Sequence, residues 1–234
     1  MKELSKEMNV QARSGKALMY GILGTVIVVA VLGGVYLFAQ KENAERQYKA
    51  DLTAGQKALE LADTADAEAA GMDKGDKERR RKIRVRDEYL DQAKNAFRIC
   101  HDERPEAVEP LLGLGRVAYL LGRYNEAIDY FKQVKELGGD SADVHYELGR
   151  SYTKWFQEKS DQTLVDNAIL HLEAAVQRDP DHVGAHMFLA TIFGDQSIYH
   201  RNESLKLKKH EDAVLRLAPD SALAEIIRED RKAQ

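Results

Sequence analysis

The stretch LGRVAYLLGRYNEAIDYFKQV, residues 114–134, decides the fold of this chain. Its opening Leu-Gly-Arg returns as Leu148-Gly149-Arg150, 34 residues further along. Around both copies, apolar residues recur three and four positions apart, which is typical of an amphipathic helix. A fixed spacing of this size indicates a repeated helical unit that buries its apolar face by stacking on its neighbours.

The composition agrees with an all-α fold. Beyond residue 39 the chain is rich in Ala, Leu, Glu, Lys and Arg, and the 234 residues include only four prolines. We find no convincing alternation of apolar and polar residues that would predict strands. The formal net charge of −4 argues against generic nucleic-acid binding, which depends on an excess of cations facing the phosphates.

A known family shares this pattern. With the Leu-Gly pair at the seventh and eighth positions, residues 108–141 carry Gly115 and Ala118 on a first helix and Phe131 on a second. This resembles the tetratricopeptide repeat (TPR) family. The resemblance implies a TPR-like α-solenoid of three to four helical hairpins, in which small residues let paired helices approach and aromatic residues fill the space between hairpins.

The resemblance also divides the chain. Matching the second unit to the pattern requires extra residues in its inter-helix turn, which we place within 159–167. Ser221 is the expected N-cap of a final capping helix. The predicted parts are a short tail (1–16), a transmembrane helix (17–39), a juxtamembrane helix and charged insertion (40–88), TPR-like repeats (89–220, with full units at about 108–141, 142–182 and 183–221) and the capping helix (221–234).

The stretch ALMYGILGTVIVVAVLGGVYLFA, residues 17–39, contains no charged side chain. As a helix it would rise about 34 Å, enough for a bilayer core of roughly 30 Å. A buried soluble helix and a cleaved signal peptide are the alternatives. The apolar region of a signal peptide runs only about 7–15 residues. We therefore predict an uncleaved signal-anchor and a single-pass membrane protein.

The orientation of this helix rests on a small difference between its two flanks. Lys and Arg are nearly balanced on the two sides, so the positive-inside rule gives almost a tie. The short N-terminal tail and its amine favour the cytoplasm for the N-terminus. The repeats would then lie in the periplasm, with the anchor in a bacterial inner membrane, and the opposite orientation stays open.

The TPR resemblance implies a peptide-binding groove lined by fixed positions of each first helix. The residues at those positions that we expect to bind a protein or peptide are Arg116, Tyr119, Tyr146, Arg150, Lys154 and Met187. Guanidinium groups bind carboxylates with two parallel hydrogen bonds, so an extended peptide with acidic or C-terminal carboxylate groups would suit them. The alternative is that the arginines pair with acids on neighbouring helices.

Four other features of the sequence could bear on binding: a basic segment, the loop before it, a histidine pair and the single cysteine. The basic segment KERRRKIRVR, residues 77–86, could contact lipid headgroups or an acidic partner, but we favour a solvated helix start, preceded by a flexible loop at 63–76. His182 and His186 have a spacing that zinc sites use, yet the sequence sets no third ligand, so we expect no metal. Cys100 lies where the repeat needs a small buried side chain.

These observations favour a binding function over catalysis. The chain has no phosphate-cradling glycine loop, nucleophile elbow or H-E-x-x-H motif. We expect no enzyme activity, no cofactor, no nucleic-acid partner and no small-molecule substrate. The expected role is a membrane-tethered scaffold or assembly factor that binds partner proteins through its groove. The alternatives are a structural or accessory subunit of a membrane complex, and an accessory chaperone in secretion or quality control.

Overall fold

The computed structural model describes the backbone of residues 2–195 and 204–233, and the side chains of 31–195 and 204–232. All regular elements in these residues are α-helices. They are α1 (Lys2–Ala70), α2 (Lys77–Glu103), α3 (Val108–Leu120), α4 (Tyr124–Glu136), α5 (Ala142–Lys159), α6 (Gln162–Arg178), α7 (Val183–Gly194), α8 (Ser204–Leu217) and α9 (Ala222–Ala233). The chain divides into two compact units, Met1–Ala50 and Asp51–Gln234.

The first unit is the N-terminal part of α1. Its large apolar side chains between Val31 and Phe38 are 58% to 70% exposed. In the part of the chain that is described, no helix has an apolar stretch long enough to cross a membrane. The structure describes side chains only from residue 31. The predicted tail (1–16) and residues 17–30 of the predicted membrane helix therefore lie outside the described side chains. Both stay predictions.

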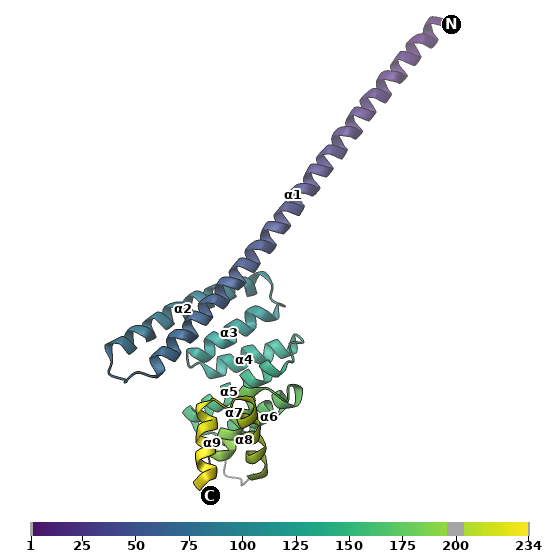
Figure 1. The fold of residues 1–234 in the computed structure, drawn as a ribbon. Helices are drawn as coiled ribbons and strands as arrows, with labels where there is room; N and C mark the ends of the chain where they lie inside the picture. The colour runs from purple at the N-terminus through teal and green to yellow at the C-terminus, as the bar shows by residue number, and fades with distance from the viewer. Residues whose placement is uncertain (1, 196–203, 234) are drawn as a thin grey trace. The chain divides into compact units, whose positions relative to one another are not determined.

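The second unit is an all-α solenoid, as the period of the Leu-Gly pair predicts (Figure 1). Its helices pack in chain order as hairpins: the end of α1 with α2, then α3 with α4, α5 with α6 and α7 with α8. Neighbouring hairpins are joined through α2 and α3, α4 and α5, and α6 and α7. This order puts the first helices α3, α5 and α7 next to one another, which is what a continuous binding surface requires.

The repeated glycines act as the pattern predicts. A methyl group added at Gly115 would lie 2.5 Å from the Phe131 ring, and one added at Gly149 would lie 2.5 Å from Leu172. Phe131 and Leu172 are fully buried. Glycine at these two positions therefore lets each first helix approach the large apolar residue of its own second helix.

The predicted loop at 63–76 is wrong for most of its length, because α1 continues to Ala70 and only residues 71–76 connect it to α2. The buried faces of Ala62, Ala65 and Ala69 explain the difference. Small residues three and four apart form a flat helical stripe against which another helix can pack. The juxtamembrane helix that we expected within 40–88 is present, but it belongs to this longer helix.

The extra residues of the second unit lengthen its helices instead of its turn. The helix α5 has 18 residues and α6 has 17, whereas α3 and α4 have 13 each. The turn between α5 and α6 is only Ser160 and Asp161. Ser160 adopts a left-handed conformation (φ 55°), and the Asp161 carboxylate caps α6 by accepting from the Thr163 backbone N–H. The prediction of an enlarged turn is therefore wrong.

The last helix, α9, begins as predicted. The Ser221 hydroxyl accepts a hydrogen bond from the Ala224 backbone N–H at 3.2 Å. Ala224 and Ile227 are buried with Val214 of α8 in a small separate cluster. The helix thus covers the apolar end of the last hairpin, as a capping helix should.

Candidate functional site

Four of the six predicted groove residues lie together on α3 and α5. Arg116 and Tyr119 come from α3, and Tyr146 and Arg150 come from α5, which packs directly against it. The Arg150 guanidinium lies 3.9 Å from the ring centroid of Tyr119 and 5.6 Å from that of Tyr146. A guanidinium over an aromatic face is attracted by the ring's electrons, so the two tyrosines hold Arg150 in place.

Glu147, which we did not predict, is the centre of this group. Its carboxylate is almost fully buried and pairs with Arg150 one turn further along α5. The Arg116 Nε donates to Glu147 Oε1 at 2.9 Å from the neighbouring helix. A buried carboxylate requires such partners, because an unpaired charge away from water is costly. One carboxylate is thus shared by two guanidiniums.

Asp63, at the C-terminal end of α1, also belongs to this electrostatic group. Partial burial raises the pKa of its carboxyl, while attraction to Arg150 and Arg116 opposes the rise. We missed Asp63 because the sequence placed it in a loop. Glu147 had a detectable signal: it precedes the repeated Leu-Gly-Arg and stands three residues before Arg150 on the same helix.

The pairing with Glu147 agrees with the alternative that the arginines form ion pairs with acids of the solenoid. It does not, however, occupy all the guanidinium nitrogens of both arginines. The Arg116 side chain is 48% exposed, whereas that of Arg150 is 20% exposed. Arg116 therefore keeps guanidinium nitrogens for a ligand, and Arg150 mainly positions the tyrosines. Arg116 thus fits the predicted binding role, whereas Arg150 fits the alternative of a structural ion pair.

The two tyrosines are neutral at physiological pH. Burial raises the pKa of Tyr119 to about 12 and also raises the pKa of Tyr146. Tyr146 further contacts the His182 ring at 4.8 Å and the Phe188 ring at 5.8 Å, both measured between ring centroids. It therefore extends the aromatic surface of the groove from α5 to α7.

The remaining two predicted groove residues are not part of this group. Lys154 points along its own helix, where its Nζ donates to Gln157 Oε1 at 3.3 Å. Met187 packs against the apolar cluster under the capping helix α9. The role of both residues in binding stays a prediction.

The predicted histidine pair separates into two roles. His182 caps α7, because its Nδ1 accepts from the Ala185 backbone N–H at 3.1 Å, and His186 instead faces His210 of α8. Among the described residues, no group of three or more His, Cys, Asp or Glu side chains could hold a metal ion. Cys100 is fully buried, as predicted, and burial raises the pKa of its thiol.

The basic segment at 77–86 forms the start of α2. Lys82 and Arg86 pair with Glu68 and Asp66 of α1, so part of its charge holds this first hairpin together. Four other cations of the segment are exposed: Lys77, Arg80, Arg81 and Arg84. This arrangement agrees with the solvated helix start that we favoured.

Comparisons with known proteins found one family match and several similar solved structures. Residues 84–142 match the tetratricopeptide repeat family, and no curated protein matches the chain. One similar solved structure is that of MamA, with 24% identity, 63% of this chain and 76% of that chain covered, and a TM-score of 0.45. Another is the K341M mutant of the Thermobaculum terrenum O-GlcNAc transferase, with 18% identity, 71% of this chain and 26% of that chain covered, and a TM-score of 0.47. A third is YrrB, described as a TPR protein with an unusual peptide-binding site, with 21% identity, 61% of this chain and 84% of that chain covered, and a TM-score of 0.30.

At these identities and TM-scores, the three structures carry no argument about what this chain binds. The family match is more specific, because it spans most of α2 together with the hairpin of α3 and α4. That hairpin contains Gly115 and Phe131, which the repeat pattern singled out. Residues 84–142 are therefore similar to the tetratricopeptide repeat family.

Proposed function

We propose that this chain is a membrane-tethered scaffold that holds a peptide or protein partner in the groove of its first helices. The observation that carries the proposal is the joint position of Arg116, Tyr119, Tyr146 and Arg150 on α3 and α5. Rigid aromatic side chains provide contact area at a low entropic cost, and tyrosine and arginine are enriched at the centres of binding interfaces.

Charge balance suggests which ligand groups would bind there. Arg116 and Arg150 face the carboxylates of Glu147 and Asp63, so the group as a whole is close to neutral. An extended peptide with a single carboxylate could pair with the exposed nitrogens of Arg116 and lay apolar atoms on Tyr146. A strongly acidic partner would meet the opposing carboxylates.

The tether is the second part of the proposal. It rests on the uncharged stretch 17–39 and on the exposed apolar side chains between Val31 and Phe38. Contiguous exposed apolar surface marks a membrane or protein contact. A periplasmic position of the repeats remains part of this proposal, and a reporter enzyme fused after Gln234 would test it.

The test of the groove is a purification of the full chain in mild detergent, followed by identification of the proteins that come with it. Arg116→Glu should lose a groove partner, because it reverses the charge that faces the ligand. Glu147 would keep Arg150 as its partner, and thermal melting shows whether the carboxylate added beside Glu147 destabilises the fold. The matched control is Arg98→Glu, at an exposed position of α2.

Retention of the same partners by Arg116→Glu would contradict groove binding. If those partners instead co-purify in a fixed ratio and depend on residues 17–39, the chain is a structural subunit of a membrane complex. Thermal melting of both variants would show that neither change has unfolded the solenoid.

A further inference from the structure

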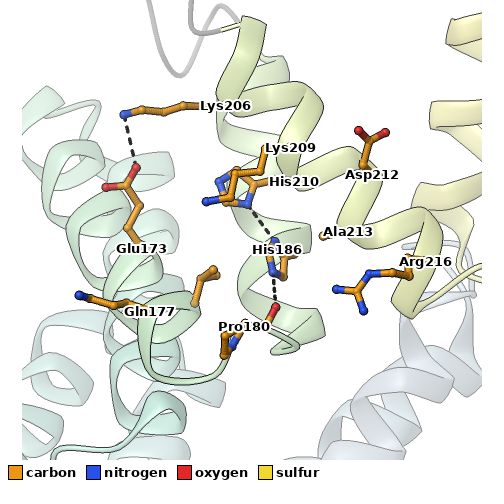
Figure 2. Close-up of a pocket in the computed structure, with 11 residues that line it drawn as sticks. Glu173, Gln177, Pro180, His186, Lys206, Lys209, His210, Asp212, Ala213 and Arg216 are labelled. Carbon is orange, nitrogen blue, oxygen red and sulfur yellow. Dashed lines mark hydrogen bonds and ion pairs between the residues drawn. The ribbon is translucent and has the colours of Figure 1, made fainter.

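A second cavity lies away from the groove, between α6 and α8, with α7 beneath it (Figure 2). Its volume is about 770 Å³, within the range of roughly 300–1,000 Å³ that ligand sites occupy. Val176, Pro180 and Ala213 give it apolar walls. None of the six predicted groove residues lines it, so it is a separate feature of the solenoid.

Most charges around this cavity are already paired. The ion pairs are Lys206 with Glu173 (3.4 Å), Arg216 with Asp181 (2.9 Å) and Asp212 with Arg231 (2.8 Å). Lys209 also lines the cavity, and within the described residues it has no acidic partner. The cavity therefore offers one ammonium group to a ligand.

The hydrogen bonds of two histidines determine what else the cavity offers. His186 Nε2 lies 2.9 Å from the Pro180 carbonyl oxygen, which can only accept, so this nitrogen carries the hydrogen. In the neutral ring, His186 Nδ1 is then the acceptor, and His210 Nδ1, 2.9 Å away, must donate to it. The Nε2 of His210 then carries no hydrogen and keeps a lone pair. Figure 2 shows the His210 ring beside Lys209 at the cavity.

The cavity thus combines a cation from Lys209, a hydrogen-bond acceptor from His210 and apolar walls. These three features complement a carboxylate, an adjacent N–H and a small apolar group. An N-acylated amino acid with an apolar side chain has all three. The same chemistry occurs in a free small acid and at the carboxyl end of a peptide.

We propose that the cavity between α6, α7 and α8 binds the carboxylate of an N-acylated apolar amino acid. Lys209 pairs with the carboxylate, His210 Nε2 accepts the amide N–H, and the side chain contacts Val176 and Ala213. This site is additional to the groove, so the chain has two binding surfaces on different helices.

The test is calorimetric titration of the full chain in mild detergent with N-acetyl-leucine and with N-acetyl-leucinamide. The acid should bind at least about tenfold more tightly than the amide, because only the acid pairs with the ammonium. Lys209→Gln should remove this preference. Lys208→Gln, an exposed neighbour that does not line the cavity, should keep it.

A second measurement covers the imidazole. In the wild-type protein with labelled histidine nitrogens, N-acetyl-leucine should shift the His210 Nε2 signal and leave that of His171 unchanged. A tetrapeptide that ends in leucine separates the two sources: tighter binding than N-acetyl-leucine identifies a chain terminus, and equal or weaker binding identifies a small acid.

Three results would overturn the proposal: no binding of either acid, equal binding of acid and amide, or an unchanged preference in Lys209→Gln. Arg116→Glu should leave the titration unchanged. Failure of the groove and failure of the cavity would therefore be seen in different experiments.

Discussion

The hairpin of α3 and α4 closes on apolar side chains, whereas the next two hairpins close on pairs of imidazoles. Leu111 occupies the fourth position of the first full repeat, and His145 and His186 occupy it in the following two. Leu111 is buried in the apolar core. His145 contacts His171 of α6 at 3.0 Å, and His186 contacts His210 of α8 at 2.9 Å, in each case between the Nδ1 atoms.

The two imidazole pairs are built in the same way. His145 Nε2 donates to Asp140 at 2.7 Å, as His186 donates to Pro180, so in both hairpins the first-helix histidine links the preceding loop to the second helix. An aromatic ring lies seven residues after each of them and stacks on the second-helix histidine: Tyr152 on His171 and Phe193 on His210. The two helices of a hairpin can therefore be held together by apolar packing or by hydrogen bonds between imidazoles. Only the stability of the second kind should depend on the protonation of histidine.

The largest effect is expected in the apolar hairpin. Phe131→Ala should lower the free energy of unfolding by about 3–5 kcal/mol, because it removes a fully buried ring and leaves a cavity against Gly115. Urea unfolding at neutral pH measures this loss. A loss below about 1 kcal/mol would show that the ring is not the main contact between α3 and α4.

Acid should act on the imidazole hairpins. Burial lowers the pKa of His171 and of His210 to about 4, below the value near 6.5 of an unfolded chain. The unfolded state therefore binds protons first as the pH falls. Stability should decline from about pH 6.5 towards pH 4, by roughly 2–3 kcal/mol for each of these histidines.

Hydrogen exchange measures where this loss occurs. Between pH 6.5 and 4.5, amides of α5 to α8 should lose protection before those of α3 and α4, after correction for the intrinsic exchange rate. Equal loss in all three hairpins would point to titration of carboxylates elsewhere and not to the imidazoles.

Breaking one imidazole pair should lower the free energy of unfolding by less than this, and replacing one histidine should cost more than replacing both. His171→Leu should lower the free energy of unfolding by about 1–3 kcal/mol, because it leaves His145 Nδ1 buried without a partner. The double change His145→Leu with His171→Leu should cost less than the single one and should remove part of the acid sensitivity. Urea unfolding of both variants at pH 7 and pH 5 compares them.

The smallest effect is expected from Asp140→Asn. Asp140 is exposed, and a hydrogen bond from Arg178 holds the pKa of its carboxyl below the usual range. Asparagine keeps an oxygen for the His145 N–H but loses the charge, so the second hairpin would resemble the third. We expect a loss below about 1 kcal/mol in thermal melting at pH 7, and a larger loss would show that the ion pair contributes beyond its surface value.

The repeat pattern predicted much of this fold from the residues that bring helices together. The helical hairpins could be predicted from Gly115, Gly149 and Phe131, because close packing of two helices depends on residue size at fixed positions. The same period placed Arg116 and Arg150 on neighbouring helices. These predictions succeeded because each depends on a fixed spacing, either within one repeat or between the first two repeats.

Contacts that cross a variable segment could not be predicted in the same way. His145 and His186 occupy the fourth position of their repeats, but their partners lie 26 and 24 residues later, beyond turns and helices of unequal length. Asp63 was missed for a related reason: its alanine-rich surroundings indicate a helix only when α2 is there to pack on it.

The additional length of α5 changes the surface of the second hairpin. It has 18 residues where α3 has 13, so it is about 7.5 Å longer at 1.5 Å per residue. The charged residues Glu158 and Lys159 lie exposed on this added length. The helix α5 therefore ends in charged residues, whereas α3 ends in the apolar residues Tyr119 and Leu120.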